Sequence, residues 1–276
     1  MRRPGQSSVR RPAVAGLFYR REPDLLDEQV QRYLQAPAPR EPEPAPRLRA
    51  IVVPHAGYVY SGPTAGVAYR LLPPLGDRVR RVLLLGPPHR VPVWGLAVSG
   101  AREWESPLGT VTLDEVGRRH LLDADVGQTP PIASVGDVAH AHEHSLEVQI
   151  PFLQRTLPGT TVLPVLVGDG SPSTLADRID SWWAEDALVV VSTDLSHYEP
   201  DAAARRHDAR TSAAVLACDP SGIADRDACG AQALRTLLAL AARHGAAVRE
   251  LDRRTSADTA GDPDRVVGYG AFAVED

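Results

Sequence analysis

Three histidines follow short apolar runs of the sequence. His55 follows the run 49–54, His89 lies just after 79–86, and His197 lies just after a third such run. In an open α/β sheet, ligands collect beyond the carboxyl ends of the strands. Neutral imidazole is the commonest protein ligand of borderline divalent metals. One such histidine alone is more often structural, but three at the ends of one sheet predict a metal centre.

A denser group of histidines and acids occupies residues 140–147, and its composition resembles a metal-binding tract. The spacing argues against that interpretation. His140, His142 and His144 alternate with other residues, which is typical of a strand or a loop, whereas Ser145 begins a helix-like pattern.

The acids of this segment offer a different role. Glu143, His144 and Glu147 can face one pocket, because His144 and Glu147 lie one helical turn apart. We expect these residues to contact the substrate or to support the metal ligands rather than to bind the metal. The alternative is a solvated acidic helix start favoured by the helix dipole, which applies most to His140 and His142.

The two cysteines differ in their surroundings. Cys229 directly precedes a helix expected over 229–244, and a helix N-terminus lowers a thiol pKa and favours the thiolate, a soft metal ligand. Cys218 ends an apolar helix and is interpreted as a small buried side chain. Two cysteines make no disulfide framework, so we expect a cytoplasmic protein.

Short apolar runs alternate with amphipathic segments along the chain. The continuous apolar runs favour strands covered on both faces, and the alternation favours a mostly parallel sheet between two helix layers. We therefore predict an α/β fold, a single three-layer α/β/α sandwich with a mostly parallel mixed sheet. Strands are expected at 49–54, 79–86, 95–99, 161–168, 187–193 and 266–274, and helices at 23–35, 62–72, 114–123, 144–157, 172–184, 200–217 and 229–244.

The chain of 276 residues is expected to form one domain. Residues 1–35 form an N-terminal arm with one helix, 36–47 a proline-rich tether with extended geometry, and 48–276 the main body. We expect the arm to be able to reach a neighbouring molecule.

Composition excludes several classes of function. All 30 basic residues are arginine, so a Schiff-base lysine and a Walker A loop are excluded. The net charge of −5 and an aromatic content of 5% argue against a nucleic-acid partner. No apolar stretch is long enough to span a membrane, and the N-terminus lacks the pattern of a secretory signal.

Several short motifs, in order, resemble the Memo-like proteins, whose bacterial and archaeal members are called AmmeMemoRadiSam system protein B. The resemblance covers about residues 12–275. It is carried by Ala15-Gly16-Leu17-Phe18-Tyr19, Val53-Pro54-His55-Ala56-Gly57-Tyr58 with Ser61-Gly62, Leu85-Gly86-Pro87-Pro88-His89, Glu143-His144-Ser145-Leu146-Glu147, Pro164-Val165-Leu166-Val167-Gly168, Ser192-Thr193-Asp194-Leu195-Ser196-His197-Tyr198, Cys229-Gly230 and Gly268-Tyr269-Gly270-Ala271.

This resemblance implies a fold similar to the class III extradiol dioxygenases and a metal site formed by His55, His89 and Cys229. It also implies that His197 is the catalytic acid or base and that Asp194 lies in the same cleft. We also expect His144, Glu143, Tyr58 and Arg90 to contact the substrate. The chain departs from the family pattern at Pro88, which replaces a serine, and at Arg90, which replaces a histidine, and both positions concern the rim of the pocket rather than the ligands. Gly230 is followed by Ala231-Gln232-Ala233, where some members have a proline.

Two imidazoles and one anionic ligand on one side of a metal leave open positions on the other side, as in the non-haem iron oxygenases. We therefore expect a redox enzyme that uses a divalent metal, with iron preferred and copper or zinc as alternatives, and that acts on a small substrate. A zinc-dependent hydrolase and a non-catalytic cleft that binds a peptide or a modified partner remain open. The family name implies radical SAM and AMMECR1-type proteins as partners.

Overall fold

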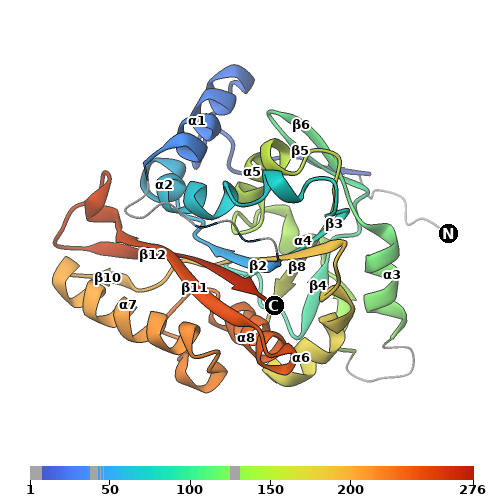
Figure 1. The fold of residues 1–276 in the computed structure, drawn as a ribbon. Helices are drawn as coiled ribbons and strands as arrows, with labels where there is room; N and C mark the ends of the chain where they lie inside the picture. The colour runs from blue at the N-terminus through green and yellow to red at the C-terminus, as the bar shows by residue number, and fades with distance from the viewer. Residues whose placement is uncertain (1–7, 38–42, 44, 46, 125–130) are drawn as a thin grey trace.

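A mixed sheet forms the centre of the protein in the computed structural model, which describes residues 8–37, 43, 45, 47–124 and 131–276 (Figure 1). Its strands run in the order β10-β12-β2-β9-β3-β8-β4-β7, and β11 also pairs with β12. Strands β2, β9, β3 and β8 are mutually parallel at the centre, whereas β12 runs antiparallel to β2, and β4 antiparallel to β8. The bounds are β2 Leu48–Val53, β3 Arg81–Gly86, β4 Leu96–Val98, β7 Ala133–Val135, β8 Thr161–Val167, β9 Ala187–Ser192, β10 His197–Glu199, β11 Ala247–Thr255 and β12 Val266–Glu275.

Side chains of the central strands alternate between two apolar cores, one on each face of the sheet. In β2, Ile51 and Val53 enter one core and Ala50 and Val52 the other. Helices α1, α2 and α5 contribute to the first core, and α3, α6, α7 and α8 to the second. The bounds are α1 Pro23–Gln35, α2 Tyr58–Tyr69, α3 Glu115–Asp123, α4 Asp137–Ala141, α5 Ile150–Thr156, α6 Pro172–Ile179, α7 Asp201–Leu216 and α8 Ala231–His244.

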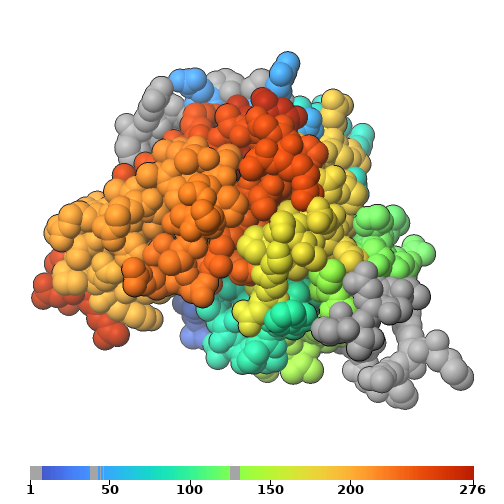
Figure 2. Space-filling view, turned by 90° about the horizontal axis from the view of Figure 1, so that it is seen from below, coloured from blue at the N-terminus to red at the C-terminus, as the bar shows by residue number. Residues whose placement is uncertain are grey.

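This arrangement confirms the predicted α/β sandwich with a mixed sheet flanked by helices. Figure 2 views the face on which α6, α7 and α8, coloured yellow to orange, form a continuous surface. None of the described helices is long and apolar enough to cross a bilayer.

Most of the expected elements are present, but some boundaries differ. The helix expected over 144–157 is shorter: a 3-10 turn at Glu147–Gln149 precedes α5, and Pro151 lies in the first turn of α5. His140 lies in the short helix α4 rather than in a strand or loop. Strand β11 was not expected because its sequence, AVRELDRRT, is charged and lacks an apolar run.

The N-terminal arm packs against the body through the buried carboxylate of Glu147. Arg10 Nη1 donates to Glu147 Oε2 at 2.8 Å, and the backbone N–H groups of Ala13 and Val14 donate to the same carboxylate at 2.8 and 2.9 Å. The Tyr19 hydroxyl adds a fourth bond at 2.7 Å. The described part of the arm, from residue 8 onward, is therefore anchored to its own body. Residues 38–42, 44 and 46 of the expected tether lie outside the described residues.

A small second sheet extends the same contact. Strand β1 (Val9–Arg10) pairs parallel with β5 (Glu103–Ser106), which pairs antiparallel with β6 (Gly109–Thr112). The Arg10 guanidinium also stacks over the Trp104 ring at 4.3 Å. The arm is thus held by backbone pairing and by a buried ion pair.

Glu147→Ala should destabilise the protein by about 3 to 5 kcal/mol, because it leaves a buried guanidinium without its partner. The free energy of unfolding follows from urea titration. Glu115→Ala is the control, since Glu115 makes an exposed pair with Arg118 at 3.2 Å and such pairs contribute less than about 1 kcal/mol. Equal losses in the two variants would contradict the anchoring role of Glu147.

Candidate metal centre

Three imidazoles converge at the carboxyl edge of the central strands. Strands β2 and β3 lead into the loops that carry His55 and His89, and His144 approaches from the segment after α4. The ring centroids of His55 lie 5.2 Å from His89 and 5.4 Å from His144, and those of His89 and His144 lie 4.7 Å apart. One nitrogen from each ring lies within 4.8 Å of the other two, so this group could hold a metal ion.

Hydrogen bonds fix the tautomer of the buried His55. Gln149 Nε2 donates to the Pro54 carbonyl at 2.9 Å and to Ser192 Oγ at 2.8 Å, and Ser192 Oγ donates to the Ser145 carbonyl at 2.6 Å. Because the single hydroxyl proton of Ser192 is used, its oxygen accepts from His55 Nδ1–H at 3.0 Å. Nε2 of His55 therefore carries the lone pair, which can accept a hydrogen bond or bind a metal.

Burial lowers the pKa of His55 well below its ordinary value, and the neighbouring His89 and His144 rings lower it further. The imidazole is consequently neutral at physiological pH. A neutral ring with its Nδ1 proton bound elsewhere is the form that binds a metal.

The carboxylate of Glu143 positions His89. Glu143 accepts hydrogen bonds from the backbone N–H of His89 at 2.5 Å and from its Nδ1 at 2.9 Å. The backbone N–H groups of His144 and Ser145 donate to Glu143 Oε1 at 2.8 and 2.9 Å, and His144 Nδ1 lies 3.2 Å from it. A carboxylate behind a histidine orients the ring and leaves Nε2 available.

Burial raises the pKa of Glu143, but the hydrogen bonds from His144, His89 and Ser145 outweigh it and hold the pKa well below its ordinary value. Glu143 is therefore ionised. It supports the imidazoles from behind and is absent from the residues that line the cleft described below.

Cys229 also lies beside His55. Its Sγ lies 3.1 Å from His55 Nε2, and the backbone N–H of Asp194 donates to Sγ at 3.3 Å. Gly230 lets this loop pack tightly, since a Cβ there would lie 2.7 Å from Thr193 Cβ. Cys229 is not a member of the three-imidazole group.

The protonation state of Cys229 differs from the thiolate favoured by its place before a helix. Burial, with a further contribution from the charge of Asp194, raises the pKa of the Cys229 thiol to about 12. Hydrogen bonds from the backbone N–H of Asp194, from Thr193 and from the backbone N–H of Gly230 lower this pKa, but they do not outweigh burial. Without a cation nearby, this side chain is a thiol; a bound metal would displace the proton.

The distance between His55 and Cys229 provides a test of whether these residues suit a metal. Nitrogen and sulfur ligands lie about 2.1 and 2.3 Å from a metal such as zinc. Two such ligands separated by the observed 3.1 Å subtend about 90° at the ion. This fits a site with its ligands on one face, and the donor set of imidazole and thiol suits iron, copper and zinc.

The imidazoles line a cleft of about 700 Å³ together with Asp194, His197 and the aromatic rings of Phe18, Tyr60, Tyr198 and Tyr269. Asp194 Oδ1 accepts a hydrogen bond from the His55 backbone N–H at 2.7 Å. Burial raises the pKa of Asp194 above its ordinary value, although the His55 N–H and the charges of His197 and His144 oppose this.

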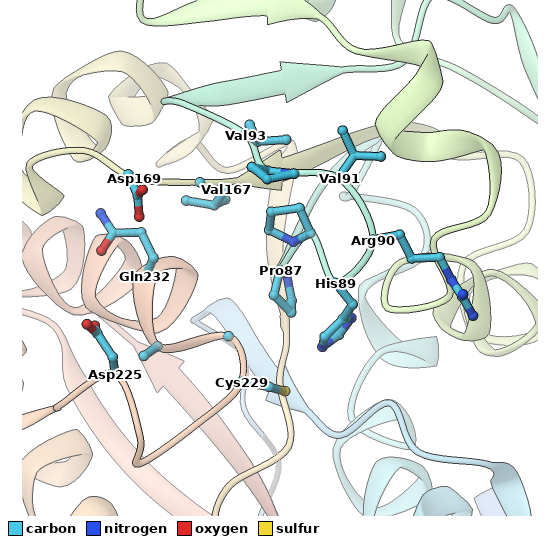
Figure 3. A pocket seen from close by; sticks show the side chains of 15 residues that line it. Pro87, His89, Arg90, Val91, Val93, Val167, Asp169, Asp225, Cys229 and Gln232 are labelled. Carbon is cyan, nitrogen blue, oxygen red and sulfur yellow. The ribbon is translucent and has the colours of Figure 1, made fainter.

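A second cavity of about 500 Å³ adjoins the first cleft (Figure 3). It shares His89 and Cys229 with the first cleft. Figure 3 shows Pro87, Val91 and Val93 on one side of this cavity, and Asp169, Asp225 and Gln232 on another. His89 and Cys229 thus lie between the two cavities.

Two expected substrate contacts lie elsewhere. Tyr58 is buried in the first core, where its hydroxyl donates to the Val148 carbonyl at 2.5 Å and its ring packs 5.1 Å from Phe152. Arg90 lines the second cavity, and its side chain points away from Cys229 in Figure 3. Glu147, as described above, faces the N-terminal arm rather than the cleft.

The remaining histidines of the 140–147 segment do not belong to the group. His142 is exposed, in agreement with a solvated role. His140 is buried, contrary to that interpretation, and its Nε2 pairs with the Ala97 carbonyl at 2.9 Å.

Sequence reasoning missed the residues that support the site. Phe18 comes from the N-terminal arm, yet its ring lies 4.6 Å from that of His144 and lines the cleft. Ser192 and Gln149 fix His55; Ser192 lies in a motif shared with the Memo-like proteins, whereas Gln149 lies outside the shared motifs. Phe18 could have been found, because it belongs to a motif that the chain shares with the Memo-like proteins.

A solved structure supports the fold. The crystal structure of an uncharacterized protein from Escherichia coli K12 superposes with a TM-score of 0.51 at 12% identity, covering 82% of this chain and 99% of that chain. At this identity the likeness concerns the fold alone.

Sequence comparisons define the family. A MEMO1 family protein from Thermotoga maritima is 34% identical, covering 94% of this chain and 97% of the relative. Another from Sulfurisphaera tokodaii is 32% identical, covering 95% and 97%, and one from Methanosarcina barkeri is 33% identical, covering 97% and 100%. The profile described as Memo-like protein matches residues 10–273. This chain therefore belongs to the Memo-like protein family.

Proposed function

We propose that this protein is a metal-dependent redox enzyme that acts on a small substrate, with iron as the preferred metal and copper as the alternative. The observation that carries the proposal is the convergence of three imidazole nitrogens within 4.8 Å in the lining of one cleft. The Nδ1 atoms of His55 and His89 are occupied by Ser192 and Glu143, so both Nε2 lone pairs are available.

In this proposal His55 and His89 are metal ligands and Cys229 supplies the anionic one, with His144 within reach as a further nitrogen. A thiolate softens the site and favours copper(I), iron or zinc over magnesium or calcium. A redox-active metal held there would supply electron transfer beside the substrate.

The other residues of the cleft have supporting roles in this mechanism. His197 moves a proton to or from the substrate, since imidazole serves this purpose near neutral pH. Asp194 holds the His55 backbone and, through its own N–H, the Cys229 sulfur. The rings of Phe18, Tyr60 and Tyr198 reduce the access of water to the reacting groups.

The proposal also covers the cellular location and the partner proteins. We infer a cytoplasmic location, and we infer radical SAM and AMMECR1-type proteins as partners. Co-purification with those proteins tests the inferred partners.

Metal content tests the proposed ligands. Protein purified without oxygen and loaded with Fe²⁺ should hold about one equivalent, measured by elemental analysis. His55→Ala should lower the affinity by more than the roughly 10- to 100-fold that loss of a supporting residue costs. His142→Ala, an exposed histidine of the same region, should leave it unchanged.

Oxygen separates the proposed redox enzyme from a zinc hydrolase. The iron- or copper-loaded protein should consume oxygen with ascorbate as the reductant, and His55→Ala should not. Absence of metal binding, or oxygen consumption equal in the two proteins, would contradict the proposal. Stoichiometric zinc without any oxygen consumption would favour the hydrolase.

Replacement of Glu143 tests whether this carboxylate supports the metal ligands. Glu143→Gln should lower the metal affinity by about 10- to 100-fold without removing a ligand, because the amide cannot accept all the hydrogen bonds that orient His89. Competition with a coloured chelator measures the affinity. Glu115→Gln is the matched surface control, and an affinity equal to that of this control would exclude the supporting role of Glu143.

The absorption spectrum of cobalt-substituted protein tests whether Cys229 is a metal ligand. Cobalt-substituted protein should show a sulfur-to-cobalt charge-transfer band that Cys229→Ser abolishes and His144→Ala retains. Because the thiol pKa is raised to about 12, metal binding at neutral pH should release one proton more in the wild type than in Cys229→Ser. Calorimetry in two buffers of different ionisation enthalpy measures this proton. A band that survives in Cys229→Ser would remove sulfur from the ligand set.

A further inference from the structure

An arginine stands beside an exposed tyrosine at the wall of the cleft. The Arg265 guanidinium lies 4.5 Å from the centroid of the Tyr198 ring, and both residues line the cleft that contains His55, His89 and His144. Stacking on a ring fixes the plane of a guanidinium while leaving its N–H groups free to bind a ligand. No ion pair with an acidic side chain joins Arg265 to the residues that the structure describes.

The backbone at Tyr198 is shaped for this position. Tyr198 has a φ of 61°, which a non-glycine residue adopts at a cost and which is concentrated at functional sites. Strand β10 pairs with the start of β12, and the register shifts between His197 and Glu199, on either side of Tyr198. The same irregularity therefore presents His197 to the cleft and places the tyrosine ring against Arg265.

The start of β12 and the loop before it are tied to the body. The Pro263 carbonyl accepts a hydrogen bond from the Asp201 backbone N–H at 2.9 Å, at the start of α7. The Arg265 backbone N–H donates to the Asp262 carbonyl at 3.2 Å. Hydrogen bonds thus hold the backbone on both sides of Arg265, in the loop before it and in the start of β12 after it.

The charge and shape of the cleft define its ligand. Arg265 is the one arginine among the lining residues described, and the chain contains no lysine. The rings of Phe18, Tyr60 and Tyr198 offer flat apolar walls. Asp194 and Asp262 also line the cleft, so a single negative charge is accommodated better than the double charge of a phosphate.

We propose that the cleft binds a planar, ring-containing carboxylate and that the fork of Arg265 N–H groups, held by Tyr198, binds its carboxylate. That this ligand is the substrate rests on the proposed function, whereas its binding by Arg265 does not require a metal. The cleft then holds the ligand at two ends: the carboxylate on Arg265 and the reacting end at the imidazoles.

Benzoate and benzamide are matched probes, because they share one ring and differ in charge. With metal-free wild-type protein, NMR titration should show benzoate binding more tightly than benzamide. Arg265→Gln should weaken benzoate by at least about tenfold, the effect expected when a hydrogen bond to a charged group is lost. Arg265→Gln should leave the affinity for benzamide unchanged. Arg265→Lys should recover part of the affinity, since lysine keeps the charge and loses the fork.

Arg206→Gln is the control for overall charge, because Arg206 is an exposed arginine of α7 that does not line the cleft. Equal weakening of benzoate by Arg265→Gln and Arg206→Gln would overturn the proposal, as would equal binding of benzoate and benzamide or no binding of benzoate. Tighter binding of phenyl phosphate than of benzoate would overturn the assignment to a singly charged group. Since no metal is present, failure here leaves the metal-dependent function untouched, and failure of metal loading leaves this result valid.

Discussion

The carboxylate of Glu143 is the interaction on which the arrangement of the imidazoles depends. It is buried beneath His89 and His144 and receives N–H groups from His89, His144 and Ser145. Burial of an unpaired carboxylate would be costly, and this set of donors compensates for it. The same bonds set the direction of the His89 ring and bring His144 onto it, with the two rings stacked at an interplanar angle of 21°. One buried charge therefore satisfies its own need for donors and orients two imidazoles.

The remaining ionisable groups of the site are kept in a state that suits a cation. Burial keeps His55 neutral and Cys229 a thiol, so neither carries a charge before a metal arrives. Burial also raises the pKa of Asp194, which lies against both of them through the His55 N–H and the Cys229 sulfur. A positive charge at this point would favour the ionised forms of both Asp194 and Cys229. His55 and Cys229 of the metal-free site are thus uncharged, and a bound cation would compensate the thiolate form of Cys229.

The central sheet and its flanking helices could be predicted from the sequence, because they follow from the periodicity of apolar residues. Apolar runs such as 187–193 predict buried strands, and parallel strands bring His55 and His89 to one edge. The sequence was insufficient where two similar residues have opposite roles. Glu143 and Glu147 lie one turn apart in the sequence, yet Glu143 contacts the imidazoles and Glu147 contacts the N-terminal arm. The place of Tyr58 in the core and the thiol state of Cys229 both follow from burial, which spacing along the chain does not reveal.

The opposite directions of Glu143 and Glu147 also explain why the N-terminal arm belongs to the site. Arg10, which pairs with Glu147, donates through Nη2 to the backbone carbonyl of Glu143 at 2.7 Å. Phe18, farther along the same arm, packs on His144 and accepts a hydrogen bond at its carbonyl from the Tyr58 N–H at 2.7 Å. A shift of the arm would therefore move the backbone that carries Glu143 and uncover the ring of His144. The arm acts as a wall of the cleft, and the ion pair that anchors it helps to hold the imidazoles in place.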